Sequence, residues 1–125
     1  KLGGLLSSKN GHSINLRFFG GDQNSLLATT GPILLTGLTN AVYEVELDFT
    51  VRVIGGAGVA LVNSSGQLTY TDAGAYKGFS IHGTSDGNFR TTVENALSVD
   101  GIFDGGATGT DDRVSISHFV LSKTF

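Results

Sequence analysis

Apolar and polar residues alternate along one long segment of this chain, from Tyr43 to Ile54. The apolar members are Tyr43, Val45, Leu47, Phe49, Val51 and Val53, and the polar members are Glu44, Glu46, Asp48, Thr50 and Arg52. A period of two residues places each set on its own face of an extended strand, whereas a helix would mix the two sets. The segment therefore predicts a strand with one buried face.

The rest of the sequence favours further strands over helices. The chain has 19 glycines and a single proline, and glycine destabilises helix interiors but suits tight turns. No stretch long enough for a helix shows a helical repeat of apolar residues. We expect strands, each bounded by Gly, Asn, Asp or Ser, at residues 13–19, 33–38, 43–54, 59–62, 68–71, 76–82, 89–99 and 114–123.

Glycine-containing segments predict where the chain turns. The run at 55–58 breaks the alternation before a short apolar strand, which is typical of a hairpin. The polar cluster at 63–66 (Asn-Ser-Ser-Gly) is typical of a turn. Gly3, Gly4 and Gly11 indicate a loose opening, so that residues 1–12 could be the tail of an upstream segment.

These segments together predict one all-β domain over residues 1–125. We expect a jelly roll or β-sandwich of about eight antiparallel strands with no substantial helix. The length suits a single hydrophobic core. Because the chain starts at Lys1 and contains no methionine, we also expect it to be the C-terminal part of a longer polypeptide.

Charge and composition argue against several classes of function. The net charge is -3, and the eight Lys and Arg residues are spread singly, which leaves no basic stripe for nucleic acid. No apolar run approaches the roughly 20 residues that cross a bilayer, so we expect no membrane insertion. Without cysteine there are no disulfides, and stability must come from core packing or subunit association.

Two segments resemble the distal head domains of viral attachment fibres, such as phage tail-fibre tips. The first is Leu38–Gly58 (LTNAVYEVELDFTVRVIGGAG), with an aromatic residue, alternating hydrophobic residues and Val-Arg before a glycine. The second is Val93–Phe125, in which a hydrophobic strand and a loop rich in Gly, Ala, Thr and Asp precede the closing strand RVSISHFVLSKTF. Neither segment is a catalytic signature.

The resemblance implies a jelly-roll head displayed at the distal end of a fibre on the virion surface. Such heads are homo-oligomers, usually trimers and in some fibres pentamers, and they attach to a glycan or protein receptor on the host cell. Two alternatives of a different kind remain open: a structural capsid or decoration protein, and a carbohydrate-binding β-sandwich module of a larger protein.

One motif could carry catalysis. Residues 83–87 match G-x-S-x-G, the nucleophile elbow, which requires a strand before the serine and a helix after it. A β-like sequence, Phe89–Val93, follows instead, so we interpret the motif as a glycine-bounded turn and expect neither an enzyme nor a cofactor. His12, His82 and His118 lie far apart in sequence; His118 alternates with apolar residues and is expected to be buried or at an interface.

An acidic segment near the end raises the question of a metal. Asp100, Asp104, Asp111 and Asp112 flank a glycine-rich run, and several carboxylates could bind a hard cation such as calcium. Their spacing fits neither an EF-hand loop nor the GGxGxD repeat. We therefore interpret these aspartates as turn residues and expect no metal.

Candidate binding residues lie in loops rich in small polar residues and tyrosine. Tyr70, Asp72 and Tyr76 would form an aromatic and acidic cluster suited to a glycan, unless the tyrosines pack into the sheet. Asp86 and Asn88 lie in a second such loop, and residues 21–24 form a third.

The closing strand is the candidate interface between subunits. Phe119 and Leu121 make one of its faces apolar only near its end, and the opening segment 2–6 could join the same seam. Phe119 and Leu121 could equally complete a second sheet of the domain itself.

Overall fold

The structure is a computed structural model that describes residues 1–21, 24–56, 58–84, 89–94, 96–105 and 112–122. Strand makes up 74% of it, and the described residues contain no helix, which confirms the all-β prediction. Its strands are β1 (Leu2–Ser8), β2 (Ser13–Gly20), β3 (Ser25–Thr29), β4 (Ile33–Leu34), β5 (Leu38–Ile54), β6 (Val59–Asp72), β7 (Ala75–Thr84), β8 (Phe89–Arg90), β9 (Leu97–Asp104) and β10 (Arg113–Phe119).

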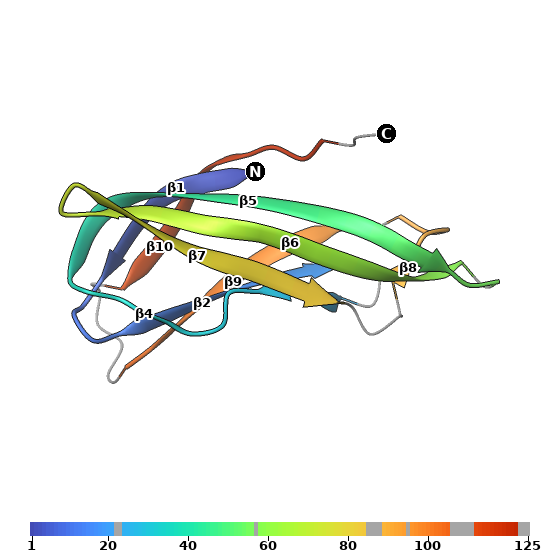
Figure 1. Cartoon of the computed structure of the whole chain (residues 1–125), viewed down its shortest axis with the longest axis horizontal. Coiled ribbons are helices and arrows are strands. Elements are labelled where there is room, and N and C mark those ends of the chain that lie inside the picture. The colour runs from blue at the N-terminus through green and yellow to red at the C-terminus, as the bar shows by residue number, and fades with distance from the viewer. Residues whose placement is uncertain (22–23, 57, 85–88, 95, 106–111, 123–125) are drawn as a thin grey trace.

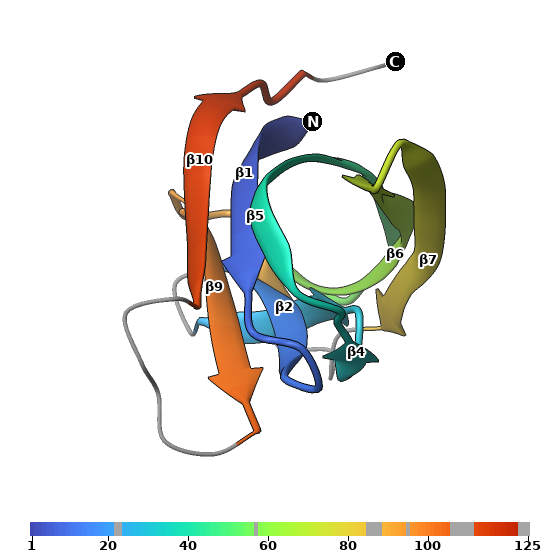
Figure 2. The same ribbon diagram turned by 90° about the vertical axis from the view of Figure 1, so that its left-hand side faces the viewer.

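The strands form one open, antiparallel sheet. Their order is β10-β1-β5-β6-β7-β3-β2-β4, with β8 paired to β6 and β9 paired to β2. The long strands β5, β6 and β7 run the length of the molecule above β2, β4 and β9 (Figure 1). Seen from the end, the sheet curls round its own interior (Figure 2). Because the sheet curls, its two ends come together and the sheet surrounds the core.

The two ends of the sheet approach each other without a ladder between them in the described residues. A Cβ on Gly101 of β9 would lie 3.0 Å from Val114 Cγ1 of β10, so the Val114 side chain lies close to the backbone of β9. Buried residues of both halves of the sheet form one cluster, which consists of Leu2, Leu6, Ile14, Leu16, Phe18, Ala28, Ile33, Leu35, Leu38, Tyr43, Val45, Leu68, Tyr70 and Ile81.

The predicted long strand is confirmed as part of β5, and its hairpin with β6 is also confirmed. The turn predicted at 63–66 is wrong, because β6 runs without a break through these residues. Gly66 is required there by close packing: a Cβ on it would collide with the main-chain oxygen of Glu46 on β5. The sequence cannot distinguish a glycine that turns the chain from one that lets two strands approach.

The opening segment is also an ordered part of the sheet and not a loose tail. β1 lies between β10 and β5, and its Leu2 and Leu6 are buried in the core. Gly4 again allows close approach, because a Cβ there would collide with the main-chain oxygen of Ser115 on β10. The glycines that suggested a flexible opening therefore pack between two neighbouring strands.

The strand predicted at 89–99 is divided into β8 and β9. Thr91 explains the break: its main-chain N–H and its hydroxyl both donate to the carbonyl of Gly58, at 2.8 and 3.0 Å, which holds this residue against the β5–β6 turn. Strand β3 was not predicted, and only Ile33–Leu34 of the predicted 33–38 strand is extended as β4.

Candidate functional site

A polar hollow of about 510 Å³ lies on the outer face of β5, β6 and β7. Cross-strand register assembles it: Asn63 of β6 pairs with Thr50 of β5 and with Thr84 of β7. In the next row, Ser65 pairs with His82. Alternate residues of a strand point to the same face, so these side chains share one surface. The hollow is lined by Thr50, Arg52, Asn63, Ser64, Ser65, His82, Gly83 and Thr84.

Arg52 lies at an irregularity of its strand. The β5–β6 register shifts between Val51, which pairs with Val62, and Val53, which pairs with Leu61, so that Arg52 has no residue opposite it. Such a bulge bends the strand and redirects its side chains, and bulges are common beside functional sites. Arg52, the one Lys, Arg, Asp or Glu among the described residues that line the hollow, therefore stands where the regular ladder is interrupted.

The lining side chains are not used by the fold itself. Within the described ranges, the side chains of Thr50, Arg52, Asn63, Ser65, His82 and Thr84 form no hydrogen bond or ion pair. They offer hydroxyl, amide, imidazole and guanidinium groups to solvent. Their hydrogen-bonding capacity is therefore not used by the described part of the chain.

The described lining of the hollow contains no arrangement of serine, histidine and carboxylate. His82 has no carboxylate partner among the described residues, and a Ser-His-Asp arrangement needs such a group to orient the imidazole. Among the described residues, no carboxylate and no aromatic ring lines the hollow. Its contacts with a ligand would be hydrogen bonds, strengthened at Arg52 by charge.

The predicted cluster of Tyr70, Asp72 and Tyr76 does not form one exposed surface. Tyr70 is only 2% exposed, and its ring stacks on Phe79 at a centroid distance of 5.9 Å. Burial raises the pKa of its hydroxyl, and the register of β6 turns the ring inward with the other even-numbered residues. Tyr70 is therefore a core residue and cannot offer its ring to a ligand, whereas Tyr76 is 85% exposed.

Asp72 serves the structure of the β6–β7 hairpin. It accepts a hydrogen bond from the Thr36 hydroxyl at 2.8 Å and forms an ion pair with Lys77 at 3.3 Å. These contacts, the Thr36 bond first, lower the pKa of the Asp72 carboxyl. The hairpin lies away from the polar hollow along β6, so Asp72 and Tyr76 are not part of the hollow.

Asp86 and Asn88 lie outside the described residues. Gly83 and Thr84, which open the G-x-S-x-G motif, form the end of β7 and line the hollow. A Cβ on Gly83 would collide with the main-chain oxygen of Leu27 on β3, so this glycine is required by strand packing. The next described element is β8, a strand, and not the helix that a nucleophile elbow needs.

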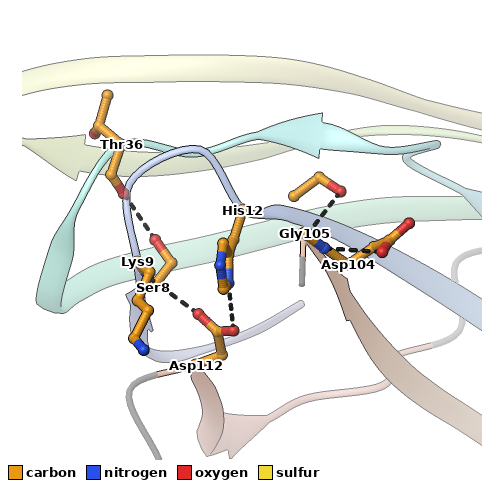
Figure 3. Close-up of polar contacts among 8 residues, drawn as sticks. Ser8, Lys9, His12, Thr36, Asp104, Gly105 and Asp112 are labelled. Atoms are coloured by element: carbon orange, nitrogen blue, oxygen red, sulfur yellow. Dashed lines mark hydrogen bonds and ion pairs between the residues drawn. The ribbon is translucent and has the colours of Figure 1, made fainter. Parts of the chain in front are cut away.

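A second polar cluster fastens the end of the sheet (Figure 3). His12 Nδ1 lies 2.6 Å from Asp112 Oδ2, and the main-chain N–H of Lys9 donates to the same carboxylate at 3.0 Å. The side chains of His12 and Asp112 are 12% and 4% exposed. The Lys9 bond first, and then His12, lower the pKa of Asp112. No hydroxyl is bonded to His12 in the described part of the chain; the nearby Ser8 hydroxyl donates to Thr36.

The acidic residues near the end have separate partners. Asp100 forms a bidentate pair with Arg17 at 2.7 and 2.9 Å, and Asp104 accepts a hydrogen bond from the main-chain N–H of Gly105. Asp112 pairs with His12. No three acidic, histidine or cysteine side chains lie close enough to share a metal ion in the residues that the structure describes. Asp111 lies outside them.

Phe119 and Leu121 are 48% and 67% exposed. With Val120 they border a small, largely apolar hollow over the core, between β1 and β5 on one side and β2 and β9 on the other. A bulge between Gly3 and Gly4 shifts the β1–β10 register. The alternation expected for β10 is therefore not regular. His118, predicted to be buried or at an interface, lies beside Gly3 and is exposed in the single chain.

Comparisons with known proteins identify no relative. No family model, curated protein or solved structure matches the chain. Among the described residues, none forms a helix that could span a membrane.

Sequence reasoning missed the residues of the polar hollow. Thr50 and Arg52 were assigned to the solvated face of a strand, and Asn63 and Ser65 to a turn. The alternation of β5 indicated a polar face. Once β5, β6 and β7 are paired, this polar face continues across all three strands. Only the pairing brings these residues together.

Proposed function

We propose that this chain is a non-catalytic binding domain, the head of a viral attachment fibre that binds a host-cell receptor at the virion surface. The observation that carries the binding role is the polar hollow, whose side chains have no partners among the described residues. The resemblance of Leu38–Gly58 and Val93–Phe125 to fibre heads supports the viral role.

The proposal includes a jelly-roll or sandwich arrangement of the sheet. Its support is that residues from both halves of the curled sheet pack against one core, as the two layers of a sandwich do (Figure 2). Strand β10 ends one side of the sheet and carries the exposed apolar residues Ile116 and Phe119, and the exposed Leu121 follows it. An end strand of this kind is a natural site for another chain to pack.

Assembly into a trimer, or a pentamer, is tested by light scattering on the purified chain at micromolar concentration. We expect an oligomer that Phe119→Asp weakens, because the new charge would be buried at the seam. The matched control is Leu34→Asp, an exposed leucine on β4. A stable monomer would contradict the fibre head and favour the alternative, a carbohydrate-binding module of a larger protein.

Receptor binding is tested with the labelled chain on cells and on an oligosaccharide array. We expect binding that falls when Asn63→Leu fills the middle of the hollow. Tyr76→Ser, at the hairpin outside the hollow, should leave binding unchanged. Absence of binding to any cell or saccharide, or equal loss in both variants, would contradict this use of the hollow and favour a structural capsid or decoration protein.

A further inference from the structure

We infer that the polar hollow binds an acidic glycan, and that Arg52 binds a carboxylate of its sugar. The inference rests on the proposed receptor-binding function and adds the chemical class of the ligand. It depends on the chemistry of the lining, the isolation of Arg52 and the distribution of negative charge on the same face.

The lining favours a ligand rich in hydroxyl groups. Across three strands it presents the hydroxyls of Thr50, Ser65 and Thr84, together with the Asn63 amide. These groups both donate and accept hydrogen bonds, as sugar hydroxyls do. An apolar peptide would find no matching surface here. The volume of about 510 Å³ falls within the roughly 300–1,000 Å³ of small-ligand sites.

The absence of aromatic lining argues against a neutral sugar as the main ligand. Aromatic side chains supply large contact area at low entropic cost, and the described residues of the lining include none. Affinity must then come from charge-assisted hydrogen bonds, which are about twice as strong as neutral ones. Among the described lining residues, Arg52 carries a guanidinium that can make them, and a guanidinium binds carboxylates through two parallel bonds.

Arg52 differs from the other arginines. Arg17 is paired with Asp100, Arg113 donates a hydrogen bond, and Arg90 has an interaction of its own. Arg52 alone has no such contact in the described part of the chain, and the bulge of β5 leaves it without a cross-strand neighbour. An unpaired guanidinium beside a group of hydroxyls is an anion-binding arrangement.

Negative charge on the same face orients the ligand. Asp48 pairs across the strands with Ser65, and Glu46 lies one row further along β5. Both carboxylates would repel an anion near the Ser65 and His82 row. The carboxylate of the sugar therefore lies at the Arg52 end, and its hydroxyls extend over Asn63 toward Thr84.

The experiment measures binding of a glucuronate-containing oligosaccharide, its methyl ester and a sulfated analogue by calorimetry. We expect the acid to bind about tenfold or more tightly than the ester, and Arg52→Gln to reduce acid binding to the level of the ester. Arg113→Gln, an exposed arginine of β10, is the matched control and should bind normally. Melting temperatures of both variants establish that each is folded.

The outcomes separate this inference from the proposed function. Equal binding of acid and ester that is lost in Asn63→Leu would retain the hollow as a receptor site and overturn the acidic ligand. Equal binding of the sulfated and carboxylated saccharides would show that the site recognises negative charge and not the carboxylate itself. This result would overturn the carboxylate assignment. No binding of any saccharide, with cell attachment unaffected by Asn63→Leu, would overturn both.

Discussion

Two polar regions of the molecule differ in whether their charged side chains have partners within the described residues. Near the β9 end of the sheet, His12 is paired with Asp112, and Arg17 of β2 is paired with Asp100 of the neighbouring β9. On the outer face of β5, β6 and β7, the lining of the hollow contains Arg52 and His82 with no partner in the described residues. The first region uses its charges within the fold, and the second is the site at which we propose that another molecule binds.

The difference suggests a way to distinguish polar groups that serve the fold from those proposed to bind a ligand. A charge that fastens two segments distant in sequence has its partner within the chain, as Asp112 has with Lys9 and His12. A charge placed for a ligand stays solvated until the ligand arrives, because an internal partner would have to be displaced first. The following predictions test whether this distinction holds.

The largest effect is expected from Gly66→Ala in the strand beneath the hollow. The added Cβ would collide with the main-chain oxygen of Glu46, so β5 and β6 must separate, at a cost of about 3 kcal/mol of unfolding free energy. Urea denaturation followed by circular dichroism measures this. Gly56→Ala, where a Cβ meets no atom within 4 Å, should change stability by less than about 0.5 kcal/mol. Equal effects would refute the packing role of Gly66.

Asp112→Asn tests the cluster that fastens the sheet ends. We expect the melting temperature at neutral pH to fall by about 5 °C, because the amide cannot reproduce the carboxylate contacts to Lys9 and His12. The matched control is Asp48→Asn on the outer face, which should leave the melting temperature unchanged.

The same variant tests how the stability of the fold depends on pH. The pKa of Asp112 is lowered from its ordinary value of 3.8, so its stabilisation is present above that value and is lost as the pH falls through the lower folded pKa. The wild-type melting temperature should therefore fall more steeply below about pH 4 than that of Asp112→Asn. Parallel curves would show that the carboxylate contributes nothing to the fold.

A gain in stability is expected at the β6–β7 hairpin, away from the hollow. Ala73 has a φ of 49° and precedes Gly74 with a φ of 82°. Asn-Gly is the favoured pair for a two-residue turn with both φ angles positive. Ala73→Asn should add about 0.5–1 kcal/mol to the unfolding free energy without altering saccharide binding. A loss of stability would indicate that the hairpin does not have this geometry.

The smallest effect, and the most direct comparison, comes from one substitution made in both regions. Arg17→Gln removes the bidentate contact with Asp100 and the stacking of the guanidinium on Phe19, and should lower the melting temperature by about 2 °C. Arg52→Gln should change it by less than about 1 °C, because no internal contact is lost. Thermal melts at low and high salt measure both. A larger loss for Arg52→Gln would make Arg52 a structural residue.

Most of the strand content could be predicted from the sequence, and little of the candidate site. Alternation located most of β5, and β7 was predicted at 76–82, whereas β6 was predicted as two strands separated by a turn. The hollow could not be predicted, since Arg52, Asn63 and Thr84 are adjacent only through strand pairing and a bulge. The pair of His12 and Asp112 joins residues 100 positions apart, which spacing alone does not reveal.

Local pattern determined the class of fold in this protein: period-two hydrophobicity and a glycine content unfavourable to helices require strands. Tertiary structure alone decided what the glycines do and which polar residues meet. Gly4 and Gly66 lie within strands, and glycine is needed at both positions because the neighbouring backbones leave no room for a Cβ. This crowding depends on partners distant in sequence. The same is true of Arg52, whose isolation depends on the register that two strands adopt when they pair.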